Sequence, residues 1–259
     1  QLDYAGKRVL VIGSGATAAT VLPAMAQTAA HVTMLQRTPS WYFALPGRDG
    51  IANFLRKILP AKAAYALTRM KNVAVQRFVF SRARNKPEAT KELLHRHLES
   101  QLGPDYNRAD FSPPYNPWEQ RMCLVPDGDF FKAIKSGKAE IVTGTIDRVD
   151  KSGVRLEDGR HLDADIVVTA TGLNLAVLGK VAISLDGVPV NFAEHFFYRN
   201  CMYSNVPNFA SLFGYLNSAW TLRVDIVAAK SGGPSRDWLT QPGYLASSRA
   251  RNKVRQLGG

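Results

Sequence analysis

Near its start the sequence reads Arg8-Val-Leu-Val-Ile-Gly-Ser-Gly-Ala-Thr-Ala18, an apolar run followed by two close glycines and small residues. The run predicts a buried strand, and the residues after it predict a tight turn that opens a helix. Together they match the form G-x-G-x-x-A, which is typical of a dinucleotide-binding strand–turn–helix unit. The alternative is a glycine turn that only packs a helix onto a sheet.

The turn itself supplies the first candidate binding residues, Gly13, Ser14, Gly15, Ala16, Thr17 and Ala18. We expect Gly13 to permit the turn, Gly15 to let the backbone approach a pyrophosphate, and Ala18 to keep the helix near the strand. The free N–H groups of the first helical turn would face the anion.

A second strand is expected over Val32–Gln36, and its end indicates which cofactor fits. NAD-binding units place an Asp or Glu here, about 20 residues past the glycines, to bind the ribose hydroxyl. This chain has Arg37 and Thr38 instead. An arginine pairs with a 2′-phosphate, so the sequence favours NADP over NAD. The alternative for Arg37 is an ordinary solvated side chain.

Length and composition restrict the remaining classes. The 259 residues, 46% of them hydrophobic, indicate a globular chain with room for one large or two modest domains. Its longest apolar stretches fall short of the roughly 18 residues of a membrane span. Two distant cysteines and five histidines without ligand spacing predict no disulfide framework, no metal site and a cytoplasmic location. Since the chain opens at Gln1 without Met, we expect a fragment.

The net charge of +12 is concentrated in two segments. Between Arg48 and Lys91 there are eleven Lys or Arg against two acidic residues, and between Lys230 and Gly259 six against one. Apolar residues at helical spacing from Ile51 onward predict a basic α-helical insertion over 46–110. Its surface is either an ordinary solvated face or an element that faces a lipophilic substrate or makes a peripheral contact with the inner face of a membrane. No nucleic-acid partner is predicted, because no recognised motif accompanies the charge.

The rest of the chain reads as alternating short elements. We expect a loop over 39–50, an irregular segment over 111–125, a helix from Asp129 to Lys135, a meander over Glu140–Val149, Val154–Glu157 and His161–Leu162, and a buried parallel strand within Asp165–Gly172. The carboxyl end of that last strand would again face a ligand crevice.

Several of these stretches resemble the flavin-containing Baeyer–Villiger monooxygenases, and most closely the mycobacterial ethionamide-activating group. The matching stretches are Gly13–Ala18, Leu35-Gln-Arg-Thr-Pro39, Tyr115-Asn-Pro-Trp-Glu-Gln-Arg121, Asp165–Gly172 and Gly214-Tyr-Leu-Asn-Ser-Ala-Trp-Thr-Leu222. They span roughly residues 1–230. The segments around Arg121 and Asn217 are far more specific than the glycine turn.

The resemblance implies an α/β fold in which a Rossmann-like, doubly wound NADP-binding domain is inserted into an FAD-binding α/β domain. The expected organisation is an NADP domain over 1–45 and 111–168, the helical insertion over 46–110, a returning, incomplete part of the FAD domain over 169–229, and an atypical, disordered tail over 230–259. In that family NADPH reduces FAD, and the reduced flavin uses O₂ to oxygenate a small lipophilic ketone or a sulfide.

The resemblance also implies roles for single residues. Arg121 matches the catalytic arginine that stabilises the oxygenated flavin anion and contacts the nicotinamide, a task suited to a permanently charged guanidinium. Gln120 matches a position that in relatives can carry a lysine for the 2′-phosphate, so Arg37 and Thr38 would carry more of that contact here. Ala170, Thr171 and Gly172 match the turn between the two domains beside the cofactor. Asn217 lies in the segment that closes over the flavin.

Two departures from the family pattern keep other interpretations open. The FAD-binding glycine fingerprint and the F-x-G-x-x-x-H-x-x-x-W signature do not occur in the sequence, and both would lie before Gln1. The resemblance also fades past Ala228. A flavin N- or S-oxygenase of the same superfamily is one alternative. A non-catalytic NADP-binding module that docks on a membrane is the other.

Overall fold

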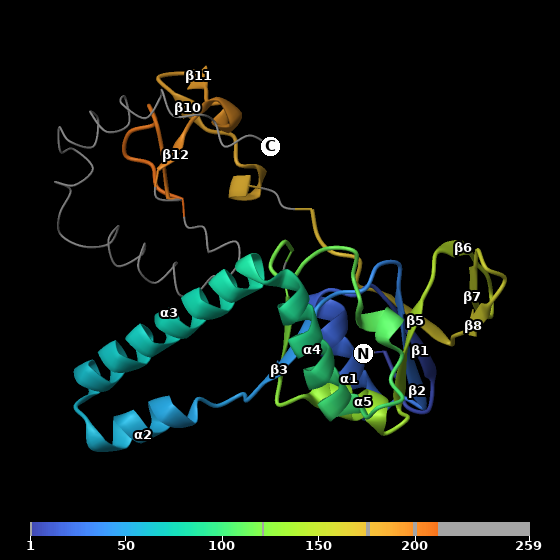
Figure 1. The fold of residues 1–259 in the computed structure, drawn as a ribbon. Coiled ribbons are helices and arrows are strands. Elements are labelled where there is room, and N and C mark those ends of the chain that lie inside the picture. The colour runs from blue at the N-terminus through green and yellow to red at the C-terminus, as the bar shows by residue number, and fades with distance from the viewer. Residues whose placement is uncertain (1, 121, 175–176, 199–200, 212–259) are drawn as a thin grey trace. The chain divides into compact units, whose positions relative to one another are not determined.

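The computed structural model describes residues 2–120, 122–174, 177–198 and 201–211 (Figure 1). By their contacts the residues separate into two compact units, Gln1–Leu173 and Asn174–Gly259. The first unit contains the Gly13–Ala18 turn and the expected helical insertion.

A four-stranded parallel sheet forms the centre of the first unit (Figure 1). In spatial order its strands are β5 (Ala139–Thr143), β2 (His31–Gln36), β1 (Arg8–Ile12) and β9 (Ile166–Thr169). Because β1 lies between two neighbours, its apolar run Val9–Val11 is buried. The predicted first and second strands are confirmed. All four carboxyl ends meet at one edge, where sheets of this kind bind their ligands.

One face of this sheet is covered by helices. These are α1 (Ala16–Ala26) and α5 (Asp129–Lys135), which pack on the strands and on each other (Figure 1). Helix α1 runs through Pro23, whose side chain is buried with Leu22. The predicted helix from Asp129 to Lys135 is confirmed.

The other face carries strands instead of helices. A three-stranded antiparallel sheet contains β6 (Ile146–Val149), β7 (Gly153–Leu156) and β8 (His161–Asp163). From β7, Val154 and Leu156 join a second buried cluster with Leu10 and Leu35. Among the described residues this differs from the predicted doubly wound arrangement, in which helices cover both faces. The predicted meander supplies the missing layer.

The meander begins later than predicted. The expected strand Glu140–Val149 is wrong as a single element, because the chain turns at Gly144. Before the turn, β5 pairs in parallel with β2; after it, β6 pairs antiparallel with β7. The amide of Gly144 donates a hydrogen bond to the Gln36 carbonyl at 2.9 Å, which continues the β5–β2 ladder to the sheet edge.

The strand expected within Asp165–Gly172 is parallel, as predicted, but it is not buried on both faces. In the described residues β9 pairs with β1 alone. Half-buried Ile166 and Val168 alternate with exposed Val167 and Thr169. An all-apolar strand therefore forms an edge here, which its composition does not reveal.

Two short strands were missed in segments predicted to be irregular. They are β3 (Tyr42–Leu45), inside the expected loop 39–50, and β4 (Cys123–Pro126), at the end of segment 111–125. They pair in parallel, and Tyr42 is fully buried. Four residues are too few to show a period, and the prolines nearby argue against strand.

The expected insertion is helical, as predicted. It consists of α2 (Gly50–Ile58), α3 (Ala61–Asn85), α4 (Pro87–Leu102) and a 3₁₀ turn, η1 (Arg108–Phe111). Helix α4 packs on the rest of the first unit through buried Leu94, His95 and Leu98, and it is capped by Gly103, whose φ is +101°. None of the described helices is both long and apolar enough to span a membrane.

The described part of the second unit consists of short elements. These are η2 (Val177–Lys180), β10 (Ser184–Leu185), β11 (Val188–Pro189), η3 (Phe192–Glu194), β12 (Phe197–Tyr198) and β13 (Met202–Tyr203). The strands form two hairpins, and Phe192, Tyr203 and Phe209 make mutual ring contacts. The predicted tail over 230–259 lies outside the described residues.

Candidate functional site

The Gly13–Ala18 turn lies at the carboxyl edge of the sheet and is held from two sides. The Gly13 amide donates to the Leu35 carbonyl at 2.8 Å, and the Ala170 amide donates to the Ile12 carbonyl at 2.7 Å. Gly13 has a φ of +134°, and a Cβ there would lie 2.3 Å from the Ala170 carbonyl oxygen. Only glycine fits this point of contact between the turns after β1 and β9.

A pocket of about 690 Å³ opens beside the turn. Predicted residues that line it are Gly13, Ser14, Gly15, Ala16, Thr17, Arg37, Thr38, Ala170, Thr171 and Gly172, accompanied by Ile12, Leu35, Gly144, Thr145 and Ile146. Ala18 lies behind the turn and is fully buried, where its small side chain lets α1 approach the sheet. The ends of four parallel strands thus contribute to one hollow.

The electrostatics of the pocket favour an anion. Arg37 is the one charged side chain among its lining residues, which include no carboxylate. Helix α1 begins after Gly15 with no side-chain cap and no acidic residue in its first turn. Its first N–H groups therefore lack intrahelical partners and present the positive end of the helix dipole. A Cβ on Gly15 would meet nothing within 4 Å, so the space beside it is open to a ligand.

A hydrogen-bond network ties the glycine turn to the segment that carries Arg37. The Ser14 hydroxyl donates to the Thr38 carbonyl at 2.9 Å and accepts from the Ser40 hydroxyl at 3.2 Å. The Tyr42 hydroxyl donates to the Ser14 carbonyl at 2.7 Å. Burial raises the pKa of Tyr42 well above its usual range, so the phenol remains a donor. The network therefore fixes the position of the backbone that carries Arg37 relative to the glycine turn.

Sequence reasoning missed one wall of the pocket, Gly144–Ile146. These residues follow β5, whose neighbour in space is β2 although more than a hundred residues separate them. A side chain at 144 would come within 2.8 Å of Leu156 Cδ1, so the backbone there lies close against the meander. The sequence signal for this wall is Gly144, a glycine directly after a strand. A single strand predicted over Glu140–Val149 runs through this glycine and so conceals the turn.

The described part of the specific segment, Tyr115–Gln120, is anchored to the same unit. The Trp41 indole donates to the Tyr115 carbonyl at 3.0 Å. Glu119 accepts from the backbone and side-chain amides of Asn116, both at 2.8 Å, and these bonds lower the pKa of its carboxyl. Between them, Trp118 has a φ of +68°, an uncommon conformation for a bulky residue. The loop is therefore tightly specified.

The remaining predicted residues are not brought into this pocket by the described structure. Gln120 is exposed on the loop, where it bridges to Pro117, and it is not among the residues that line the pocket. Arg121 and Asn217 lie outside the described residues. Two residues past Arg121, the Cys123 thiol lies 3.8 Å from the Ser14 carbonyl. The predicted roles of Gln120, Arg121 and Asn217 stay predictions.

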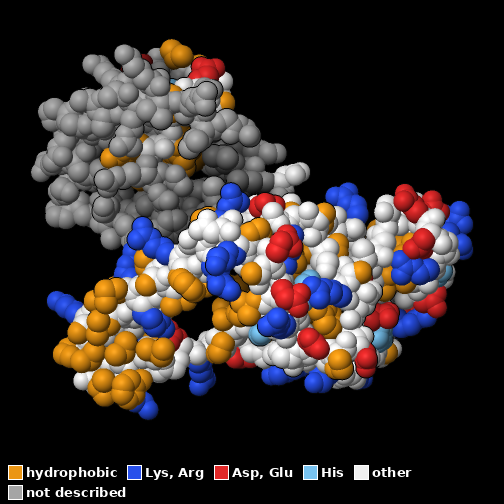
Figure 2. Space-filling view, in the orientation of Figure 1, with side chains coloured by type: hydrophobic (Ala, Val, Ile, Leu, Met, Phe, Trp, Pro, Cys, Tyr) orange, Lys and Arg blue, Asp and Glu red, His pale blue; other side chains and the backbone are white. Residues whose placement is uncertain are grey.

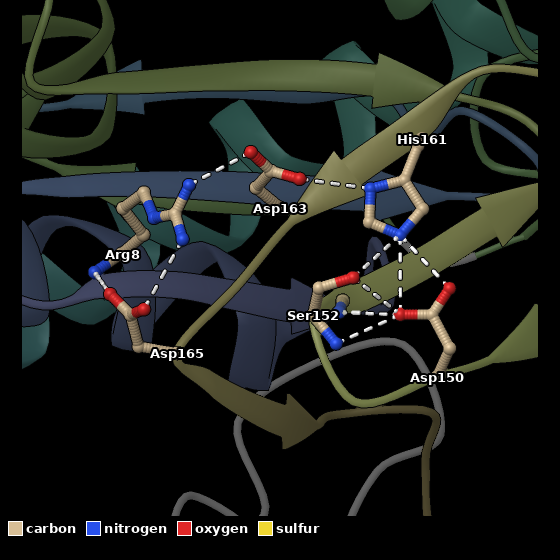
Figure 3. Close-up of polar contacts among 7 residues, drawn as sticks. Arg8, Asp150, Ser152, His161, Asp163 and Asp165 are labelled. Carbon is tan, nitrogen blue, oxygen red and sulfur yellow. Dashed lines mark hydrogen bonds and ion pairs between the residues drawn. The ribbon is translucent and has the colours of Figure 1, made fainter.

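A second polar cluster fastens the meander to the start of β1 (Figure 3). Arg8 contacts Asp163 and Asp165 at 2.9 Å and 3.3 Å, and its amide donates to Asp165 at 2.7 Å. His161 lies between Asp163, at 2.9 Å from Nδ1, and Asp150, at 3.1 Å from Nε2. Asp163 and Asp165 thus serve as structural residues beside Arg8. Among the described residues no group of His, Cys, Asp or Glu could hold a metal ion.

This cluster predicts an acid-sensitive meander. Hydrogen bonds from Ser152, and then from His161, lower the pKa of Asp150 to about 2. An aspartate in an unfolded chain titrates near 3.9, so the contribution of Asp150 to stability is present above that pH and is lost as the pH falls toward 2. We expect Asp150→Asn to lower the thermal midpoint at pH 6 and to flatten its decline between pH 5 and 3, measured by circular dichroism. Asp147→Asn, an exposed aspartate on β6, is the control, and an identical acid profile for both variants would contradict the assignment.

No family model matches the chain. Among curated proteins, it is 45% identical over 228 residues to the probable FAD-binding monooxygenase AlmA of Acinetobacter baylyi, covering 88% of this chain and 46% of AlmA. It is 47% identical over 229 residues to the FAD-containing monooxygenase EthA of Mycobacterium tuberculosis, covering 88% of this chain and 47% of EthA. The chain therefore spans about half the length of the curated relatives that it matches.

Among solved structures, the fold is similar to that of an oxidized steroid monooxygenase bound to NADP. The TM-score is 0.63 at 18% identity, over 89% of this chain and 54% of that one. At this identity the likeness concerns the fold alone.

Proposed function

We propose that this chain, a homologue of one part of the FAD-containing monooxygenases, is the NADPH-binding part of a flavin monooxygenase of the Baeyer–Villiger type. The observation that carries the proposal is Arg37, which lines the pocket at the end of β2 where NAD-specific units place a carboxylate. The sequence relatives, 45% and 47% identical, support the reaction class.

The pocket residues fit NADP. Gly15–Thr17 would hold the pyrophosphate on the uncapped end of α1, and Arg37 with Thr38 would hold the 2′-phosphate. Ala170–Gly172 would line the side of the cofactor that reacts. The glycine turn and the Ala170–Gly172 turn lie in close contact, since a Cβ at Gly13 would meet the Ala170 carbonyl.

The chemistry belongs to the whole protein. In the whole protein NADPH would supply two electrons and FAD would pass them to O₂, so that one oxygen atom enters a small lipophilic ketone or a sulfide and the other leaves as water. We assign Arg121 to hold the anion that develops beside the flavin, since a guanidinium stays charged throughout. Asn217, with the rest of 169–229, is assigned to the flavin side, and Gln120 to a lesser contact with the 2′-phosphate than that of Arg37 and Thr38. A cytoplasmic location is part of the same proposal.

The selectivity of the pocket tests the proposal on this chain directly. We expect the chain to bind NADPH more tightly than NADH in a fluorescence titration. Arg37→Gln removes the charged partner of the 2′-phosphate and should weaken NADPH binding about tenfold to a hundredfold, the usual range for a hydrogen bond to a charged group. NADH carries no such phosphate, so its affinity should change less than threefold on the same scale.

Arg48→Gln is the matched control, because Arg48 is an exposed arginine that does not line the pocket. It should leave both affinities unchanged. Equal affinity of the unaltered chain for NADPH and NADH, or an equal loss of both in Arg37→Gln, would remove Arg37 from cofactor selection. Absence of any binding would reject the NADP assignment itself.

A further inference from the structure

Helix α2 leaves an apolar face uncovered. Ile51, Phe54 and Ile58 recur at i, i+3 and i+7, so they share one side of the helix, and each is 58–60% exposed. The same nine-residue helix buries Ala52, packs against α3, and carries Arg56 and Lys57 in its last turn. It is amphipathic, and of its residues only Ala52 is buried.

Helix α3 extends this uncovered surface. Along its 25 residues only Ala64 and Ala83 are buried. Tyr65, Met70 and Phe78 are 64–67% exposed, an unusual degree for side chains of this size. In Figure 2 the hydrophobic side chains gather over α2 and the adjoining end of α3, with Lys and Arg at the margin. We call the outward side of α2 and α3 the arm surface.

The charge of the arm surface is one-sided. Helices α2 and α3 carry eight Lys or Arg and no acidic residue, and the two acidic residues that flank them are both already paired. Asp49 caps α2 and pairs with Lys71, and Glu88 pairs with Lys91 at 2.8 Å. A purely apolar partner would bury cations without carboxylates, which is costly. Bulk water would leave the apolar side chains exposed.

An anionic lipid surface satisfies both halves of this pattern. Acyl chains accept the outward face of a short amphipathic helix, while headgroup phosphates accept the cations at its margin. We propose that the arm surface docks on an anionic membrane, with Ile51, Phe54 and Ile58 entering the acyl boundary and Arg56 and Lys57 contacting phosphates. This inference goes beyond cofactor binding and does not depend on it.

The test is co-sedimentation of the chain with vesicles of phosphatidylcholine alone and of phosphatidylcholine mixed with phosphatidylglycerol. We expect binding to the mixed vesicles that weakens as salt rises, and little binding to phosphatidylcholine alone. Arg56→Gln/Lys57→Gln should weaken binding about tenfold or more, given the usual contribution of a cation near an anionic surface. Phe54→Gln/Ile58→Gln should weaken binding at every salt concentration.

Val149→Gln is the control, because Val149 is an apolar side chain, 61% exposed, on β6 and away from the arm surface. It should bind like the unaltered chain. NADPH titration and circular dichroism of each variant separate lipid binding from folding and from the proposed cofactor site.

Three results would overturn the proposal. They are absence of vesicle binding, equal binding to both vesicle types, and binding that the arm variants leave unchanged. Sedimentation velocity without lipid measures whether the chain self-associates, and so tests whether a second copy of the chain covers the arm surface instead. A self-association lost in Phe54→Gln/Ile58→Gln, together with no lipid binding, would assign the arm surface to a second copy of the chain.

Discussion

Gly13→Ala is expected to destabilise the first unit strongly, whereas Gly15→Ala is expected to weaken nucleotide binding strongly in a chain of near-original stability. At position 13 an added Cβ meets the Ala170 carbonyl oxygen at 2.3 Å, on a backbone with φ of +134°. The neighbouring β1–β9 ladder cannot yield without losing its own hydrogen bonds. We expect a loss of about 3 kcal/mol in unfolding free energy, or roughly 10 °C in thermal midpoint.

At position 15 the same methyl group meets nothing within 4 Å, and φ is −84°. The fold should therefore tolerate alanine, with a thermal midpoint within about 2 °C of the original, as for surface changes in general. The methyl instead enters the pocket where a pyrophosphate would approach the backbone, and NADPH affinity should fall by about a hundredfold.

Calorimetry and NADPH titration of the same samples measure both effects. Gly50→Ala is the control for adding a methyl to an unhindered glycine, because position 50 also has nothing within 4 Å and does not line the pocket. It should change neither property by more than the modest gain typical of glycine replacement in a helix. If Gly13→Ala melted like the original chain, the tight β1–β9 contact would be wrong.

The sequence predicted those elements whose signal is local. The strand Arg8–Ile12, the turn at Gly13 and the helix after it follow from adjacent residues. Elements that depend on a distant partner were not predictable in the same way. Strands β3 and β4 are four residues each and are stabilised by pairing with each other. The residues next to either strand give no sequence signal for its partner.

The candidate site divides along the same line. Arg37 could be named because it lies a fixed number of residues past the glycines. Gly144–Ile146 could not, because its place in the pocket depends on β5 lying beside β2. The second face of the sheet was also misjudged, since helices and a meander bury a sheet equally well and the choice rests on Val154 and Leu156 reaching Leu10. The features that the sequence did not predict are therefore those that depend on long-range strand pairing rather than on the preferences of single residues.

In the complete monooxygenase that we propose, Arg121→Ala is expected to remove ester formation while NADPH-dependent flavin reduction continues. In the described loop before it, Glu119 accepts a hydrogen bond from the Asn116 amide, and the Trp41 indole donates one to the Tyr115 carbonyl. Within this loop Trp118 has a strained backbone, with a positive φ. Such strain persists only where the surroundings enforce it, and it gathers at functional sites. A loop fixed this firmly, beside the turn that would hold NADP, suits a residue that must be positioned rather than mobile.

The expected size follows from the role proposed for Arg121. Loss of one preorganised donor to a developing anion typically lowers turnover about a hundredfold to a thousandfold. Hydride transfer needs no such anion, so flavin bleaching in stopped flow should slow by less than about tenfold, the cost of one positioning contact. NADPH would then be consumed without ester, and the missing oxygen would appear as hydrogen peroxide. Arg48→Ala should behave like the unaltered enzyme. Unchanged ester yield in Arg121→Ala would move the anion-holding role to another residue, and parallel loss of flavin reduction would assign Arg121 to cofactor binding instead.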